Sequence, residues 1–456
     1  MNDALFSEFD PVSAKEWRHK IQMDLKGADY NEALVWQSLE GIHVRPFYHR
    51  DDFEKEFASI PGQPSQWDII QSLYIDDEAI CNALLLDALE RGAEAIYLTS
   101  EKPFDIQKTF QGFPFEKAKI YFHIAFLDLP FKEELITFLQ LHKATVYYNI
   151  DLIHHLCEDG NWFHGMEKDH EILDTLISKY PTANLLGVNT TIYQNAGANI
   201  VQQLAYAVAH ANEYLHHFQS HESISLCFQV AVGGNYFFEI AKIRALRILY
   251  ATLASEYALP ETCHIVAIPS KRNKTLYDYN VNMLRTTTES MSAIFGGANA
   301  VCSLPYDALY HKSNEFGERI ARNTLLILKK ESYFDLVANP ADGSYYIEKL
   351  TQGMAEKALA LFKEIEKGGG FLAQLKEGII QRKIKESAQK EQQYFEEGKL
   401  VLLGSNKYPN PKDYMKNDLE LYPFVKTKNR KTIIAPIIEK RWAETYEKNR
   451  LDHEEK

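Results

Sequence analysis

The 456-residue sequence has few cysteines, and their spacing does not suit a disulfide scaffold or a metal site. The five cysteines are an odd number, and no two of them form a C-x-x-C pair. Cys81, Cys227 and Cys302 lie inside apolar runs, which favours buried thiols in a reducing compartment over disulfides or a zinc site. No feature of the sequence supports a catalytic cysteine.

Long apolar runs and an excess of basic residues are also missing. No stretch reaches the ~18 apolar residues of a transmembrane helix, so we expect no membrane span. The opening residues, MNDALFSEFDPVSAKEW, are acidic and lack the apolar core of a signal peptide, which predicts a cytoplasmic protein. The net charge is −13, which argues against binding of nucleic acid. We attribute this charge to solubility.

Residues 1–66 are predicted to form an arm and not a domain of their own. Ser13 and Glu16 have the spacing of a capping box, for a helix that reaches about Leu25 and stops at Gly27. The arm contains two tryptophans but has few neighbours in sequence to bury them. It must therefore dock, either on the body of its own chain or on a partner chain, and the sequence leaves both open.

From residue 67 onward, a short apolar run is repeatedly followed by a longer amphipathic stretch. The runs are continuous and not alternating, which is typical of parallel strands covered on both faces. Eight such repeats predict a closed (β/α)8 barrel over residues 67–350, with an open doubly wound sheet as the alternative. The predicted strands are 67–75, 93–98, 118–124, 144–150, 184–190, 224–231, 264–268 and 299–304.

Five of the stretches between these runs carry apolar residues at helical spacing. We interpret Gly296 and Gly297 as a helix C-cap, and Asp342 with Gly343 as a turn. The predicted helices are 77–91, 199–218, 237–254, 279–295 and 318–330.

The last segment, 351–456, is rich in Lys and Glu and only weakly apolar. A helix is predicted around 351–367, ended by the glycines at 368–370. The remainder has too few large apolar residues for a second open α/β domain. We therefore expect a helical C-terminal extension that packs on the barrel.

Five blocks occur in order between residues 24 and 351. They are DLKGADYNEALVWQSLEGIHVRPFY in the arm, AGANIVQQLAYAVAHANEYL at 196–215, FQVAVGGNYFFEIAKIRALRILY at 228–250, NVNMLRTTTESMSAIFGGANAVCSLPYD at 280–307 and RIARNTLLILKKESYFDLVANPADGSYYIEKLT at 319–351. Together they resemble the methylmalonyl-CoA mutase family, in particular the small, non-catalytic subunits of its heterodimeric members. The resemblance implies a part in the interconversion of methylmalonyl-CoA and succinyl-CoA with adenosylcobalamin.

The cobalamin signature of the family is missing from the sequence. Family mutases hold the cofactor in a C-terminal flavodoxin-like domain, where a D-x-H-x-x-G motif supplies the histidine ligand of cobalt. The nearest matches, Asp151-Leu-Ile-His154 and Asp452-His453, lack this spacing, and we interpret both as surface residues. We therefore expect no cobalamin-binding domain, no cofactor held by this chain, and adenosylcobalamin on a partner large subunit.

The family's catalytic residues also differ. Catalytic chains carry a Tyr-His pair just after strand five, ahead of the Ala-Gly-Ala found at 196–198, and Thr191 and Ile192 stand at the matching positions. Isoleucine cannot donate a hydrogen bond to an acyl carbonyl, so the resemblance implies a degenerate active site. Arg285 and Thr286, near the start of the helix after strand seven, could retain an acyl-CoA pocket. The alternative is that Arg285 pairs with Glu289, one turn further along.

The resemblance implies a structural role: to support the catalytic large subunit in a heterodimer through an interface of more than ~2,000 Å². Three other functions stay open. An active barrel could use a separate cobalamin-binding protein, although Thr191 and Ile192 argue against this. An unrelated barrel enzyme could use His123, Asp151 and Asn189 at strand ends, and a non-catalytic module could bind CoA through the pocket at Arg285. The candidates for the partner interface are Trp17, Leu34, Val35 and Trp36.

Overall fold

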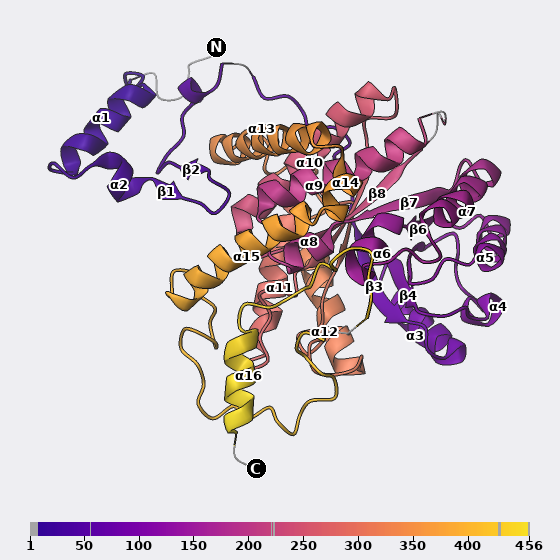
Figure 1. Cartoon of the computed structure of the whole chain (residues 1–456). Helices are drawn as coiled ribbons and strands as arrows, with labels where there is room; N and C mark the ends of the chain where they lie inside the picture. Colours follow the sequence, from indigo (N-terminus) through magenta and orange to yellow (C-terminus); the bar gives the residue numbers. More distant parts are fainter. Residues whose placement is uncertain (1–7, 55, 220, 222–223, 427–429, 455–456) are drawn as a thin grey trace.

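The chain folds around a closed barrel of eight parallel strands, in the order β10-β3-β4-β5-β6-β7-β8-β9 (Figure 1). The computed structural model describes residues 8–54, 56–219, 221, 224–426 and 430–454. All eight predicted strands are confirmed, and closure of the sheet excludes the open doubly wound alternative. The strands are β3 (Asp68–Tyr74), β4 (Ala95–Ser100), β5 (Lys119–Ile124), β6 (Val146–Ile150), β7 (Asn184–Asn189), β8 (Leu226–Val232), β9 (His264–Pro269) and β10 (Ala300–Cys302).

Aromatic side chains fill the inside of the barrel. Tyr121 and Tyr147 stack with their ring centroids 4.9 Å apart, and the Tyr121 hydroxyl lies 2.9 Å from Nε2 of His264. The Tyr97 hydroxyl donates to Oε1 of Gln229 at 2.7 Å. These side chains come from five of the eight strands, so the barrel axis is a packed core and not a channel.

Helices surround the strands, and their apolar faces pack against the outside of the barrel. The five predicted helices are confirmed, although the last one begins earlier and ends in a π-helical turn, Ile327–Glu331. Gly297 ends α11 in the left-handed region (φ +88°), as a helix C-cap requires. The helices are α3 (Glu78–Glu90), α4 (Ile106–Thr109), α5 (Leu129–Leu141), α6 (Leu152–Asp159), α7 (Met166–Lys179), α8 (Thr191–Asn195), α9 (Ile200–His217), α10 (Tyr236–Glu256), α11 (Val281–Gly296) and α12 (Glu315–Leu326).

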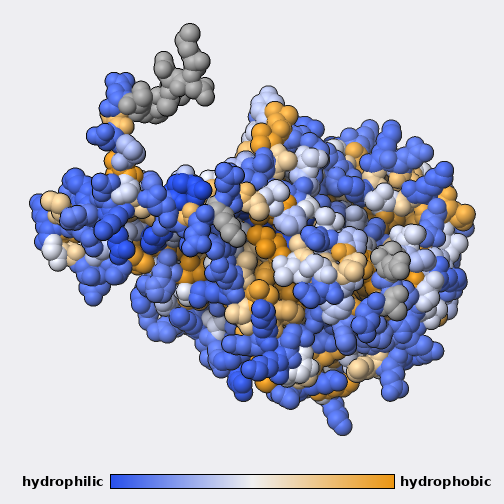
Figure 2. All heavy atoms as spheres, turned by 90° about the horizontal axis from the view of Figure 1, so that it is seen from above, coloured by the Kyte–Doolittle hydropathy of each residue, from blue (hydrophilic) through white to orange (hydrophobic). Residues whose placement is uncertain are grey.

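The N-terminal arm stands apart from the barrel in Figures 1 and 2. Its first helix carries the expected capping box, because the Ser13 hydroxyl accepts from Glu16 N while the Glu16 carboxylate accepts from Ser13 N. Apolar surface, orange in Figure 2, is visible where the arm meets the body. The arm consists of α1 (Ala14–Asp24), α2 (Tyr30–Leu34), β1 (Trp36–Gln37), β2 (His43–Val44) and the short helix Arg50–Asp52.

The C-terminal part begins with α13 (Tyr345–Lys367), which packs along α9 and α10. This helix starts six residues before the predicted start at residue 351, and the turn expected at Asp342–Gly343 lies just ahead of it. The helices α14 (Phe371–Lys376) and α15 (Ile379–Glu396) follow, and α16 (Glu444–His453) lies near the end of the chain. Among the described residues, no helix is long and apolar enough to cross a membrane. All five cysteines are buried and unpaired, as predicted.

Candidate functional site

The residues selected from the sequence lie at the carboxyl ends of the strands, which is the face where barrel enzymes place their active sites. Strand β7 is followed by Thr191 and Ile192, strand β8 by Gly233, and strand β9 by a polar loop that contains Lys274. Arg285 lies in the second turn of α11, after that loop. The contacts of these residues show what the face can do chemically.

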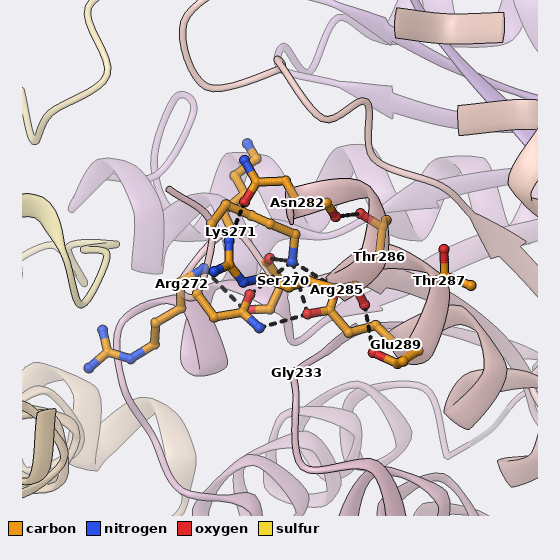
Figure 3. A network of polar contacts seen from close by, with 12 residues as sticks. Gly233, Ser270, Lys271, Arg272, Asn282, Arg285, Thr286, Thr287 and Glu289 are labelled. Atoms are coloured by element: carbon orange, nitrogen blue, oxygen red, sulfur yellow. Dashed lines mark hydrogen bonds and ion pairs between the residues drawn. The ribbon is translucent and has the colours of Figure 1, made fainter. Parts of the chain in front are cut away.

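Arg285 is held by the protein itself (Figure 3). Its Nη1 donates to Thr275 Oγ1 at 3.0 Å and to Asn282 Oδ1 at 2.8 Å, and its Nη2 donates to the carbonyl of Leu403 at 2.6 Å. The Thr286 hydroxyl donates back to the carbonyl of Asn282 within the helix, and its side chain is buried. Both residues of the expected acyl-CoA pocket therefore have protein partners, and neither lines the cavity described below.

The alternative, in which Arg285 pairs with Glu289, is wrong. Glu289 accepts instead from Lys274, whose Nζ lies 2.7 and 2.9 Å from the two carboxylate oxygens, and from Asn273 Nδ2 at 2.7 Å. Burial raises the pKa of Glu289 and lowers that of Lys274, while the contact between them opposes both shifts. A lysine from the preceding loop thus neutralises the carboxylate that local helix spacing assigned to Arg285.

A second buried pair lies beside the end of β8. Lys242 and Glu239 form an ion pair within α10, and Lys242 Nζ also donates to Gln194 Oε1 at 2.9 Å. Glu239 Oε1 accepts from the backbone N–H of Gly233 at 2.9 Å. A side chain at Gly233 would place Cβ 2.6 Å from Gln194 Nε2. The mouth of the barrel is therefore filled by satisfied polar groups at this point.

The positions that match the family's catalytic pair have ordinary structural roles. The Thr191 hydroxyl donates to Asn189 Oδ1 at 2.6 Å, at the start of α8. Ile192 is buried in the main hydrophobic core. Neither side chain presents a hydrogen-bond donor to a substrate at the mouth of the barrel.

The C-terminal segment covers this mouth. The backbone N–H of Lys440 donates to the carbonyl of Asn195 at 3.1 Å, and that of Trp442 donates to the carbonyl of Arg272 at 3.0 Å. Arg272 Nη1 donates back to the carbonyl of Lys440 at 2.6 Å, and Arg441 Nη1 donates to the carbonyl of Lys274 at 3.1 Å. These contacts hold the segment across the ends of β7 and β9.

The three residues considered for an unrelated barrel enzyme, His123, Asp151 and Asn189, do come together. They line one cavity of about 30 Å³ at the ends of β5, β6 and β7. Asp151, however, is a structural carboxylate: its Oδ1 accepts from His210 Nε2 and from the Tyr214 hydroxyl, both at 2.9 Å. Burial opposes its ionisation, but His210, His154 and the backbone N–H of Asn189 hold the pKa of Asp151 below its ordinary value.

The interpretation of Asp151 and His154 as surface residues is wrong. Asp151 caps α6 by accepting from the backbone N–H of His154 at 2.8 Å, and the His154 ring donates to the carbonyl of Asn189 at 3.1 Å. Both side chains are buried, and both bind the backbone of Asn189 at the end of β7. The interpretation holds for Asp452 and His453, which are exposed.

Lys132 lines the same cavity and was not selected from the sequence. A usable signal was present: Lys132 shares one helix face with the apolar residues Leu135, Ile136 and Leu139. A lysine on the apolar face of a helix is buried or must reach past that face to solvent. The structure buries it, with 2% of its surface exposed.

Comparison with known proteins agrees with this architecture. Residues 118–450 match the family model described as methylmalonyl-CoA mutase. The chain is 33% identical to the methylmalonyl-CoA mutase small subunit of Porphyromonas gingivalis, over 90% of this chain and 71% of that protein. It is 29% identical to the small subunit of Streptomyces virginiae, over 84% of this chain and 68% of that one. It is 28% identical to the methylmalonyl-CoA mutase of Cereibacter sphaeroides, over 86% and 64% of the two chains.

Fold and site define a (β/α)8 barrel whose mouth is covered by its own chain. The chain belongs to the methylmalonyl-CoA mutase family, and its resemblance to the small subunits of that family is confirmed.

Proposed function

We propose that this chain is the small subunit of a heterodimeric, adenosylcobalamin-dependent methylmalonyl-CoA mutase, and that it supports a catalytic large subunit without catalysing the reaction itself. The observation that carries the proposal is the filled barrel. Tyr97, Tyr121 and Tyr147 occupy its axis, and residues 439–442 cross its mouth. An acyl-CoA would have to displace several of these groups before it could reach the strand ends.

The residues at the mouth also do not fit a bound cobalamin. Ile192 is buried where the family's catalytic histidine would stand, and Gln194 with Glu239 fills the space above Gly233. We therefore derive no catalytic step through a cofactor in this barrel, and we assign adenosylcobalamin and the isomerisation of methylmalonyl-CoA to the large subunit. This assignment places the active site of the complex on the partner chain.

The arm supports a partner-binding role. Trp17 and Trp36 are 45% and 50% exposed, and Leu34 beside them is also exposed. Each tryptophan has an aromatic neighbour in its own chain: Trp17 stacks on Phe47, with centroids 4.3 Å apart, and the Trp36 ring lies tilted to that of Phe238, with centroids 5.4 Å apart. Half-exposed tryptophans on a projecting arm are the type of residue that contributes most to the binding energy of an interface.

The test is to co-express this chain with a large subunit and measure their association. We expect a 1:1 complex, with Trp36→Ala weakening it at least tenfold because a large apolar contact is lost. The matched control is Leu141→Ser, because Leu141 is 78% exposed on α5, in the barrel and not in the arm. Equal affinity for the wild type and Trp36→Ala would remove the arm from the interface. No complex at all would contradict the subunit role.

A further inference from the structure

The cavity at the ends of β5, β6 and β7 contains a lysine that the fold does not neutralise. Lys132 lies on the inner face of α5 and is almost completely buried. Among the described residues, its Nζ makes no hydrogen bond and no ion pair, and it lies 5.7 Å from the centre of the Phe126 ring. Every other buried lysine, namely Lys242, Lys274 and Lys329, has a carboxylate partner among those residues.

Two more polar groups in the same cavity lack partners. No hydrogen bond joins the His123 ring to any described residue, and burial lowers the pKa of His123 to about 4. The ring is therefore neutral near pH 7, with one N–H to donate and one nitrogen to accept. The side-chain oxygen of Asn149 is buried without a partner, while Nδ2 of the same residue donates to the carbonyl of Phe122 at 3.1 Å.

The carboxylates around the cavity do not neutralise Lys132. Asp151 is bound to His210 and Tyr214, and Glu158 is largely exposed at the rim, 4.0 Å from His154 Nε2. Asp128 is exposed and caps α5 by accepting from the backbone N–H of Phe131, and its attraction raises the pKa of Lys132 less than burial lowers it. A buried ammonium without a counter-charge costs several kcal/mol, so Lys132 either loses its proton or acquires an anion. Burial lowers the pKa of Lys132 to about 7, which makes both states accessible near neutral pH.

We propose that this cavity is a binding site for one small oxyanion of the size of formate or bicarbonate, with the Lys132 ammonium as counter-charge and the His123 N–H as hydrogen-bond donor. The cavity of about 30 Å³ exceeds the ~10–15 Å³ that one water needs, and it is far too small for an acyl-CoA. The site goes beyond the proposed subunit role and does not depend on it.

Calorimetric titration of the full chain with sodium formate, at constant ionic strength and pH 7.5, tests the site. We expect 1:1 binding with uptake of a fraction of a proton, because the anion favours the charged form of Lys132. Repeating the titration in buffers with different ionisation enthalpies measures that uptake. Lys132→Met is expected to abolish binding, whereas Lys117→Met, at an exposed lysine on the loop before β5, is expected to leave it unchanged.

Two outcomes would overturn the proposal. One is the absence of binding for both formate and bicarbonate up to tens of millimolar, which would make this a water-filled cavity. The other is equal binding by the wild type and Lys132→Met. His123→Phe provides a second variant that leaves the lysine in place, and we expect it to weaken binding about tenfold through loss of the N–H donor. Unchanged binding in that variant would remove His123 from the site.

Discussion

Lys274 reaches both carboxylate oxygens of Glu289, at 2.7 and 2.9 Å, in a place where neither side chain is exposed. This ion pair joins the loop after β9 to α11 and leaves Arg285 to bind Thr275, Asn282 and the Leu403 carbonyl. The polar groups near the end of β9 thus serve the packing of the chain on itself. That is the property expected of a barrel retained for support.

The pair gives a first prediction. Glu289→Gln leaves the Lys274 ammonium buried without a counter-charge, so we expect a loss of about 3–5 kcal/mol of unfolding free energy. Lys274→Met with Glu289→Leu removes both charges, and we expect this double variant to be clearly more stable than Glu289→Gln. Urea denaturation of the two variants and the wild type measures this. If the double variant is as unstable as Glu289→Gln, the loss of stability comes from altered packing and not from an unpaired charge.

Lys132 predicts how stability depends on pH. Its pKa is lowered to about 7 in the folded protein, while an unfolded lysine titrates near its ordinary value of 10.5. Between these values the unfolded state binds more protons, so this residue makes stability rise with pH, by at most about 1.4 kcal/mol per pH unit. The free-energy cost of burying the charged Lys132 ammonium is present in full below pH 7 and decreases as the pH rises above 7.

Denaturation of the wild type and Lys132→Met between pH 6 and 9 isolates this contribution. We expect the advantage of the methionine variant to be largest at pH 6 and to shrink as the pH rises. Lys117→Met, with its exposed side chain, should follow the wild type throughout. A constant difference between wild type and Lys132→Met would show that Lys132 does not titrate in this range.

The barrel axis supplies a third prediction. Tyr97→Phe removes the hydroxyl that donates to Gln229 at 2.7 Å and leaves a buried amide oxygen unpaired. We expect a loss of about 1–3 kcal/mol of unfolding free energy. Tyr74→Phe is the matched control, because Tyr74 is half exposed at the end of β3, and we expect no measurable change there. Equal effects at the two positions would show that the hydroxyl inside the barrel is not important for packing.

Gly197 gives a test of the C-terminal cover. It has φ +103°, and a Cβ on it would lie 2.5 Å from the Ala388 Cβ and 2.6 Å from the Arg272 Nη2. Gly197→Ala should therefore push α15 and the Arg272 loop away from the mouth and speed proteolysis within 397–443. Gly343→Ala is the control, because Gly343 also has positive φ (+77°) but no atom within 4 Å of its Cβ position. Equal proteolysis rates in the two variants would show that strain, and not contact with α15, is responsible.

The strands were predictable because each is a continuous apolar run, and parallel strands covered on both faces need apolar residues on both sides. The arm helix was predictable from Ser13 and Glu16, since a capping box is purely local. The start of α13 at Tyr345 lies six residues before the predicted start, because the turn residues 339–344 lead directly into Tyr345 and no local signal separates that turn from the beginning of the helix.

The site contacts were less predictable, because they join residues far apart in the chain. Helix spacing suggested Glu289 as the partner of Arg285, whereas Glu289 actually pairs with Lys274, from the loop before the helix. The spacing of Asp151 and His154 does not match the cobalamin motif and gives no sign of a buried role, yet the Asp151 carboxylate binds Tyr214 from α9. Local sequence patterns contain no information on such contacts.

Methylmalonyl-CoA turnover by the purified chain and by its complex with a large subunit, both with added adenosylcobalamin, shows whether this chain supports catalysis without performing it. We expect no turnover by this chain alone and activity in a 1:1 complex. Turnover by this chain when only a small cobalamin-binding protein is added would show that the barrel is catalytically active.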